Sequence, residues 1–341
     1  MNEPTRPGAP IPPAEAAPGG TPRRRFLQIS AAAAGATLLS SCFGGGGEDA
    51  PPLLGGVEVD PMTRFDHLVV VMFENRSFDN LLGYLYAQGT APAGWPQAVP
   101  LPPPLPAGQS FDGLFDKVFH NGDGSGKVYA HPHGFAPADA TMSNWTHPDP
   151  DPGEGLAHTA TQLAGGKMTG FVADYRATNA ELSAAQVDAI MGSYAPAHLP
   201  VLAGLAQQFA VFDHWYCAVP SETYCNRSFF HASTSSGFVE NAPKDKWKQN
   251  TAPTIFDRLE AASPDPGWKV YFEKAATAPE QAEFPHGLTG FVHPEVSRKH
   301  PERFVDYAHF FTDVAKGTLP AYAFFERVYG GHDDFHPPGD V

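Results

Sequence analysis

The chain has 341 residues, with 22 Lys and Arg against 37 Asp and Glu, so its formal charge at pH 7 is −15. This acidic balance argues against general binding to nucleic acids, which requires a basic surface. The length suffices for one large α/β domain or two smaller ones. The three cysteines, Cys42, Cys217 and Cys225, include no CxxC pair, so a zinc site built from thiolates is not supported.

The first 56 residues have the composition of an export signal followed by a tether. Pro, Ala and Gly dominate residues 1–22, and a basic patch that includes Arg23 and Arg24 then precedes a short apolar run over residues 29–39. This run is too short to cross a bilayer comfortably, and the basic patch resembles a twin-arginine signal. We therefore expect an exported protein that is periplasmic, at the cell surface or secreted.

The end of the signal leaves two alternatives open. Leu39-Ser40-Ser41-Cys42 resembles a lipobox, in which Cys42 would be lipidated and would anchor the protein to a membrane. A plain cleaved signal with an incidental Cys is the other reading. In either case the Gly-rich residues 43–56 are expected to form a flexible tether.

Residues 65–82, FDHLVVVMFENRSFDNLL, combine a buried strand, a polar turn and a helix start. The apolar run over residues 68–72 predicts a central parallel strand that is buried on both faces. Glu74 and Asn75 follow it, and Ser77 is a good N-cap. Ligands bind at the carboxyl edge of such sheets, where Glu74 and Asn75 could offer oxygens to a hard cation. A polar turn without a ligand is the alternative.

The middle of the chain begins with loops. Residues 87–110 carry many Pro, and residues 111–160 are rich in His, Asp, Gly and Pro, densest in THPDPDPGE. Loops with this composition often carry functional residues, although a solvated acidic turn is the commoner explanation for a single residue. Leu residues at helical spacing predict a helix near residues 199–206.

A second candidate site lies in residues 209–230, FAVFDHWYCAVPSETYCNRSFF. Residues 209–216 are predicted to form a strand, and a helix is predicted to begin at Thr223, a plausible N-cap. A hydroxyl at a helix N-terminus is well placed for phosphoryl transfer, because the N–H groups and the helix dipole favour a phosphate there. Arg227, one turn later, could contact phosphate oxygens in bidentate fashion. An ordinary cap with a surface arginine is the alternative.

The last third of the chain alternates predicted helices and strands. Residues 254–259 are predicted to start a short helix and WKVYF to form a strand, whereas residues 240–250 are expected to form a solvated loop and residues 275–300 to be irregular. A strand is predicted over residues 319–326, followed by GGHDDFHPPGDV. Two His and two Asp at a strand exit could bind a metal or a phosphate, and a flexible acidic terminus is the alternative.

Several of these segments resemble the bacterial phosphoesterase family of phospholipases C and acid phosphatases, which belongs to the alkaline-phosphatase-like superfamily. VVVMFENRSFDNLLGYL is similar to the opening motif of that family, whose Glu-Asn pair binds a catalytic metal. The resemblance assigns this role to Glu74 and Asn75. SETYCNRSFFHASTSSG is similar to the nucleophile segment. It implies Thr223 as nucleophile and metal ligand, with Asn226 and Arg227 as the supporting pair that binds substrate.

The resemblance also implies two histidines at the site. The family carries a His-Pro-Pro element after a Leu-Pro strand, and its His contacts the phosphoryl group, which assigns a catalytic role to His336. A substrate-contacting His is expected in the loops before residue 160, and His147 is our candidate, although DPDPGEGLAH departs from the family pattern.

Two further departures fall in the nucleophile segment. Ser221-Glu222 stands where Gly-Pro is common, and Cys225 stands where Pro is common. Glu222 adds a negative charge that could weaken the binding of dianionic monoesters. Cys217 and Cys225 could form a disulfide in an exported protein, which the sequence leaves open.

Strands that alternate with helices predict an α/β/α sandwich around a mainly parallel sheet. The resemblance agrees and makes residues 57–341 a partial catalytic domain. The expected function is metal-dependent hydrolysis of phosphate esters or phospholipids, with a divalent ion of unknown identity. A sulfatase is disfavoured because no CxPxR element is present. A non-catalytic surface lipoprotein that binds phosphoryl ligands is the alternative.

The resemblance further predicts that the chain is C-terminally incomplete. Family members continue past the His-Pro-Pro element to a motif resembling DEHGG, which supplies further metal ligands and which this sequence lacks. Glu74, Asn75 and Thr223 form a small set for a hard cation, which takes about six oxygens. We therefore expect weak metal binding and low turnover.

Overall fold

The computed structural model describes residues 65–122, 126–139, 142–262, 264–274, 283–327 and 336. The expected export signal, Cys42 and the tether lie outside these residues, as does most of the segment after Arg327. His67–Val341 forms one compact unit. Among the helices of the described ranges, none has the length and apolar character needed to span a membrane.

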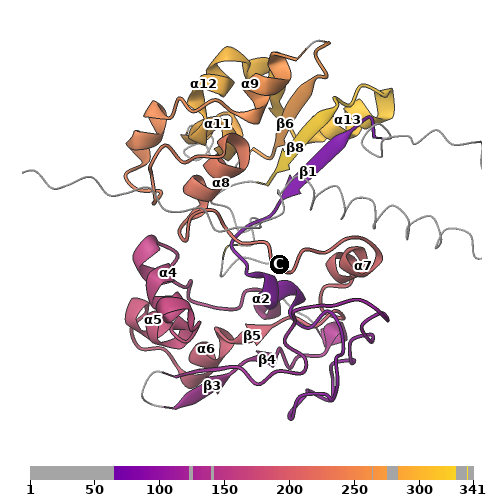
Figure 1. The fold of residues 1–341 in the computed structure, drawn as a ribbon, viewed down its shortest axis with the longest axis vertical. Coiled ribbons are helices and arrows are strands. Elements are labelled where there is room, and N and C mark those ends of the chain that lie inside the picture. The colour runs from indigo at the N-terminus through magenta and orange to yellow at the C-terminus, as the bar shows by residue number, and fades with distance from the viewer. Residues whose placement is uncertain are drawn as a thin grey trace, which may run out of the picture. The chain divides into compact units, whose positions relative to one another are not determined.

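The main sheet has four strands in the order β1-β8-β6-β7 (Figure 1). Its members are β1 (Leu68–Met72), β6 (Trp268–Phe272), β7 (Phe304–Asp306) and β8 (Tyr322–Glu326), and every neighbouring pair is parallel. The predicted parallel sheet is therefore confirmed, as are the strands predicted over WKVYF and up to Glu326. Parallel neighbours require crossover connections, which helices provide here.

Helices cover both faces of this sheet. On one face, Trp268 and Phe324 pack with Phe256 of α9 (Ile255–Glu260) and Val296 of α12 (Pro294–Lys299) in a core of buried aromatic and aliphatic side chains. On the other face, the ring of Phe310 in α13 (Ala308–Lys316) packs edge-on against Tyr271 and Phe325. The sheet is thus the middle layer of the predicted α/β/α arrangement.

The first strand occupies a different place from the one predicted. We predicted a central strand buried on both faces, but β1 is an edge strand, and within the described ranges it pairs only with β8. Val70 and Met72 pack against the core, whereas Leu68 and Val71 are more than half exposed. An apolar run indicates which side chains avoid water, but it does not determine the order of strands in the sheet. Helix α13 packs over β6 and β7 and not over β1.

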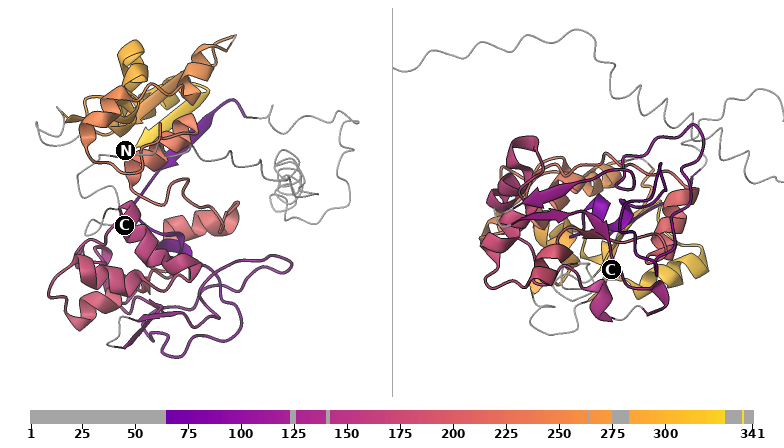
Figure 2. Two further views of the ribbon diagram at one scale, coloured as in Figure 1. Left: turned by 60° about the vertical axis from the view of Figure 1, so that its left-hand side comes forward. Right: turned by 90° about the horizontal axis from the view of Figure 1, so that it is seen from below.

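The other described elements include two small sheets and a group of short helices (Figure 2). The antiparallel pair is β2 (His120–Gly122) and β3 (Lys127–Tyr129), and the parallel pair is β4 (His131–Pro132) and β5 (Gly192–Ser193). The helices are α2 (Phe78–Leu82), α3 (Met142–Trp145), α4 (Leu156–Leu163), α5 (Phe171–Thr178), α6 (Ala184–Ala189), α7 (Pro200–Gln208), α8 (Thr223–Ala232) and α11 (Gly287–Val292). Helix α7 confirms the helix that the spacing of the Leu residues predicted near residues 199–206.

Three local predictions are wrong. Residues 209–216 form a loop in which Trp215 and Tyr216 are largely exposed, because no neighbouring strand among the described residues pairs with this apolar segment. Residues 275–300 contain α11 and α12. Lys244–Gln249 forms a 3-10 helix, since Trp247 is wholly buried and pulls this Lys-rich segment onto the protein.

Candidate active site

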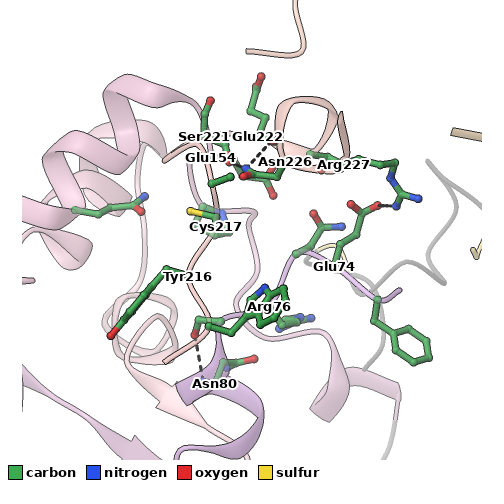
Figure 3. Close-up of a pocket in the computed structure, with 18 of the residues that line it drawn as sticks. Glu74, Arg76, Asn80, Glu154, Tyr216, Cys217, Ser221, Glu222, Asn226 and Arg227 are labelled. Carbon is green, nitrogen blue, oxygen red and sulfur yellow. Dashed lines mark hydrogen bonds and ion pairs between the residues drawn. The ribbon is translucent and has the colours of Figure 1, made fainter. Parts of the chain in front are cut away.

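A pocket of about 800 Å³ opens at the carboxyl end of β1 (Figure 3). It is lined by the turn between β1 and α2, by the loop before α8 and by the first residues of α8. Five of the predicted site residues line it together: Glu74, Asn75, Thr223, Asn226 and Arg227. The two candidate histidines, His147 and His336, are not among the described residues that line it.

The turn between β1 and α2 presents Glu74 and Asn75 to this pocket. Ser77 is the N-cap of α2, and its hydroxyl accepts a hydrogen bond from the N–H of Asn80 at 3.2 Å, as predicted. Asn75 adopts a φ of 70°, in the left-handed region that Asn tolerates better than most residues. Arg76 donates a hydrogen bond to the backbone carbonyl of His147, which ties the turn to the neighbouring loop.

The start of α8 places the Thr223 hydroxyl at the pocket wall. The helix begins at Thr223, where it was predicted, but its N-cap is Glu222, because the backbone is still extended at that residue. The N–H of Tyr224 donates to Oδ1 of Asn241 at 2.8 Å, so the side chain of another loop caps this end of the helix. Thr223 is therefore the first helical residue.

Asn226 holds the loop that leads into Thr223. Its Oδ1 accepts from the N–H of Val219 at 2.9 Å, and its Nδ2 donates to the carbonyls of Val219 and Ser221, both at 2.9 Å. The amide is therefore engaged with the backbone one turn ahead of the helix. Such a closed set of hydrogen bonds fixes the shape of the loop and with it the position of Thr223.

Arg227 lies between two carboxylates that come from different strands. Its Nη1 lies 2.7 Å from Oε2 of Glu326, the last residue of β8, and its Nη2 lies 3.5 Å from Oε1 of Glu74. The hydroxyl of Thr289 donates to Oε2 of Glu326 at 2.6 Å. Burial raises the pKa of Glu326, while Arg227 and the donors of Thr289 oppose the rise. Glu326 was not predicted as a site residue, although an acidic residue that ends the apolar run YAFF was a usable signal.

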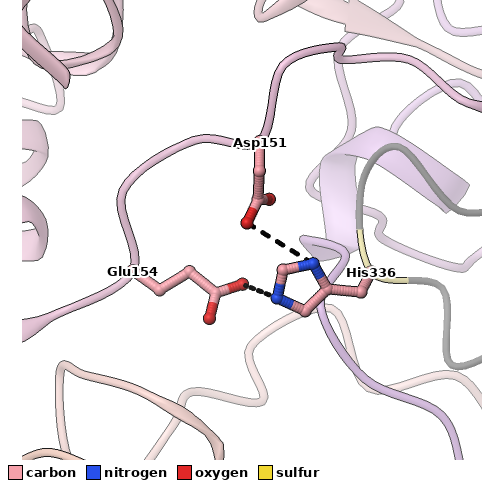
Figure 4. Close-up of side chains that lie close together, drawn as sticks. All are labelled: Asp151, Glu154 and His336. Atoms are coloured by element: carbon pink, nitrogen blue, oxygen red, sulfur yellow. Dashed lines mark ion pairs between the residues drawn. The ribbon is translucent and has the colours of Figure 1, made fainter. Parts of the chain in front are cut away.

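His336 lies between two acidic side chains (Figure 4). Its Nδ1 is 3.4 Å from Oδ2 of Asp151, and its Nε2 is 3.3 Å from Oε1 of Glu154. The three residues offer ligand atoms within 4.8 Å of one another, so they could hold a metal ion. Glu154 also lines the pocket, which brings His336 to its edge. Asp151 and Glu154 were missed as individual residues, although the acidic segment that contains them was noted.

His147 contacts the pocket region only indirectly. Its ring stacks on that of His133, with centroids 5.8 Å apart, and its backbone carbonyl accepts the hydrogen bond from Arg76. The next residue, Pro148, lines the pocket. His147 thus adjoins residues that line the pocket without lining it itself, and its role in binding substrate stays a prediction.

Cys217 and Cys225 are free thiols in the structure. Cys217 is exposed and lines the pocket, whereas Cys225 is buried inside α8. Burial raises the pKa of Cys225 to about 11, so its thiol stays protonated at neutral pH. The disulfide that the sequence left open is not formed.

The donors in the pocket suit a hard divalent cation. Glu74, Asn75 and Thr223 offer carboxylate, amide and hydroxyl oxygens, the ligand types that Mg²⁺ and Ca²⁺ prefer. The group of Asp151, Glu154 and His336 includes an imidazole nitrogen, which suits transition metals such as Zn²⁺ better. In the latter group the imidazole faces a carboxylate on each side, so one nitrogen could bind a metal while the other donates to a carboxylate.

Comparison with known proteins decides the family. Residues 65–341 match the profile of the Phosphoesterase family. The chain belongs to this family. Among its curated relatives, non-specific phospholipases C1 and C5 of Arabidopsis thaliana are each 30% identical, over 291 and 290 residues. Each alignment covers 80% of this chain, but 46% and 49% of the two relatives. This phosphoesterase chain thus spans about half the length of the curated relatives it matches.

Proposed function

We propose that this chain hydrolyses phosphate esters through attack by Thr223, as a phospholipase C-like phosphodiesterase or an acid phosphatase. The observation that carries the proposal is the convergence of Thr223, Glu74, Asn75 and Arg227 on one pocket at the carboxyl end of β1. The membership of the Phosphoesterase family and the names of the plant relatives support a phosphate ester or phospholipid substrate.

The reaction proceeds in two displacements. Oγ of Thr223 attacks phosphorus and forms a new P–O bond, while the bond from phosphorus to the leaving alcohol breaks and its electron pair goes to the departing oxygen. The hydroxyl proton of Thr223 is lost to solvent, and the leaving oxygen takes up a proton. Water then attacks the phosphorus and breaks its bond to Oγ, which takes up a proton and restores the Thr223 hydroxyl. A diester substrate releases a phosphomonoester in this step, and a monoester releases inorganic phosphate.

Three residues of the chain support these steps. Asn226 holds the loop before Thr223 and so fixes the direction of its hydroxyl. Arg227 lies at the pocket wall and orients Glu74, a proposed metal ligand, through the ion pair from its Nη2. His336 lies beside Glu154 at the edge of the pocket and supplies the proton to the leaving alcohol.

We propose that a divalent metal is held by Glu74, Asn75 and Thr223. These residues would place such an ion where it would lower the pKa of the Thr223 hydroxyl and offset negative charge on the phosphoryl oxygens. The family is generally metal-dependent, which supports this requirement. Asp151, Glu154 and His336 form the other candidate metal position, and the two positions make different predictions for substitutions at Glu74 and at His336.

The experiment compares chromogenic phosphodiester and phosphomonoester substrates with purified protein, with and without a chelator. We expect turnover that the chelator abolishes and that added divalent metal restores. Turnover of the diester above the monoester assigns the phospholipase C-like activity, and the reverse assigns the acid phosphatase. Phosphate-ester binding without turnover at any metal concentration would contradict the proposal and favour a non-catalytic binding protein.

A further inference from the structure

Glu326 is a buried carboxylate around which several chain segments are built. It is 1% exposed and ends β8, and it accepts hydrogen bonds from Nη1 of Arg227 and from the hydroxyl and N–H of Thr289. A Cβ added to Gly287 would lie 1.9 Å from Oε1 of Glu326, and Gly287 has a φ of +65°. The start of α11 therefore approaches the carboxylate so closely that only glycine fits.

Stability does not explain this arrangement well. A buried ion pair often contributes little to folding, because the cost of removing two charges from water offsets their attraction. Replacement of a buried ion pair by well-packed apolar residues of similar volume is often neutral or stabilising. A fully hydrogen-bonded carboxylate is therefore more readily explained by what it does to its partner, Arg227.

The partner connects Glu326 to the pocket. Arg227 directs Nη1 to Glu326 and Nη2 to Oε1 of Glu74, which lines the pocket and is a proposed metal ligand. Glu326 itself is not among the described residues that line the pocket. In the parallel sheet it lies opposite Met72, two residues before Glu74, so the two carboxylates flank the guanidinium from adjacent strands.

The charges of Glu74, Arg227 and Glu326 indicate how this arrangement affects metal binding. Two carboxylates around one guanidinium leave a net negative charge, so Glu74 keeps its attraction for a cation although it is near Arg227. Without the charge of Glu326, Arg227 would pair with Glu74 alone and would cancel that attraction. The guanidinium would also lose its anchor and turn further towards the pocket.

We propose that Glu326 is a positioning residue for the proposed phosphoester hydrolysis, which acts through Arg227 to orient Glu74 and to keep it available to a metal ion. This inference rests on the proposed function only for its effect on turnover. Its effect on metal binding is independent of which ester, if any, the protein cleaves.

The test compares wild type with Glu326→Gln, which keeps the size of the side chain and removes its charge. Calorimetric titration of metal-free protein with Ca²⁺, Mg²⁺ and Mn²⁺ identifies the ion that binds most tightly, and that ion is then used throughout. Substitution of a residue that orients a metal ligand typically costs about 10- to 100-fold in affinity or activity. We expect a loss in this range in metal affinity and in kcat, with KM changed less than about 3-fold.

Asp313→Asn is the matched control. Asp313 is a mostly buried carboxylate that pairs with Lys269 at 2.6 Å and accepts a hydrogen bond from Tyr271 at 2.7 Å, on the face of the sheet that α13 covers. Its loss should lower thermal stability while metal affinity and kcat stay at wild-type values. Equal loss of metal affinity in both variants would overturn the inference, because destabilisation alone would then explain it.

Glu326→Asp keeps the negative charge and separates positioning from folding. We expect it to fold and to retain metal affinity within about 3-fold, while kcat falls by less than in Glu326→Gln. If Glu326→Gln does not fold, an unchanged kcat in Glu326→Asp overturns the inference. Wild-type metal affinity in folded Glu326→Gln also overturns it. Absence of turnover in the wild type would contradict the proposed function but would leave the metal titration as a valid test.

Discussion

Val71 of β1 lies directly opposite Phe325 of β8 in the parallel sheet, yet only Phe325 is covered on that face. The ring of Phe325 packs against Phe310 of α13, with centroids 5.7 Å apart, whereas Val71 is 51% exposed. No strand of the described ranges pairs with the outer edge of β1, which therefore combines exposed apolar side chains with backbone groups that can pair with another strand. Such an edge favours association between copies of a protein.

We predict that Val71→Lys reduces self-association while it changes the free energy of unfolding by less than about 0.5 kcal/mol, because the side chain already faces solvent. Light scattering across a concentration series measures association, and urea unfolding measures stability. Val70→Lys is the control. Because Val70 packs against the core, this variant should lower the free energy of unfolding by about 3 kcal/mol or more. Equal stability of the two variants would show that β1 is not at an edge.

The local elements of the site could be predicted from the sequence better than their arrangement in space. The N-cap at Ser77 and the parallel strands WKVYF and YAFFE follow from short-range signals, namely a capping side chain and apolar runs. Helix α8 begins at Thr223 as predicted, but the N-cap role assigned to Thr223 was wrong, since Glu222 is the N-cap. The edge position of β1 and the loop at residues 209–216 depend on which segments pair in space, and an apolar run carries no information on its partner.

The same distinction applies to the site. The convergence of Glu74 and Thr223 on one pocket follows from the rule that ligands bind at the carboxyl ends of parallel strands. The hydrogen bonds from Arg227 and Thr289 to Glu326, and the position of His336 between Asp151 and Glu154, could not be predicted. Each joins residues that are far apart in the sequence, and no local pattern specifies such pairs.

Two substitutions distinguish the two candidate positions of the metal. We predict that Glu74→Ala lowers metal content and turnover together, because it removes both the charge and the geometry of a ligand. His336→Ala should lower turnover by about 10²- to 10⁴-fold, the usual contribution of a general acid, and leave metal content unchanged. Elemental analysis of the purified variants measures the metal. Loss of metal from His336→Ala alone would assign the ion to the group of Asp151, Glu154 and His336.

The buried histidines make stability depend on pH. Burial lowers the pKa of His133 to about 3 and that of His293 to about 4, below the ordinary value of 6.5. The unfolded chain therefore binds protons that the folded chain rejects between about pH 6.5 and pH 4. As the pH falls through this range, each such histidine costs up to about 1.4 kcal/mol of stability per pH unit.

We predict that His133→Phe reduces this fall, because a phenyl ring fills similar space and binds no proton. Urea unfolding at several values between pH 4 and pH 7 measures the slope. His214→Gln is the control. Hydrogen bonding to Asp213 raises the pKa of His214, so this histidine favours the folded chain as the pH falls, which is the opposite of the effect of His133. An unchanged slope in His133→Phe would show that this histidine is not held in the neutral form.

The export prediction rests on residues outside the described ranges. Replacement of Arg23 and Arg24 by Lys should hold the precursor in the cytoplasm, since the twin-arginine pair is read by its transporter. Cell fractionation and immunoblotting follow the protein. Continued export of this variant would exclude the twin-arginine route and leave a different signal to be found.

The most direct test of the proposed chemistry is the turnover of Thr223→Ala, measured with a chromogenic phosphodiester and saturating metal. Removal of the nucleophile should abolish detectable turnover, while the thermal midpoint stays within about 3 °C of wild type because no core contact is lost. Thr223→Ser, which keeps a hydroxyl, should retain measurable turnover. Near wild-type turnover in folded Thr223→Ala would contradict the assignment of the nucleophile, and with it the proposed mechanism.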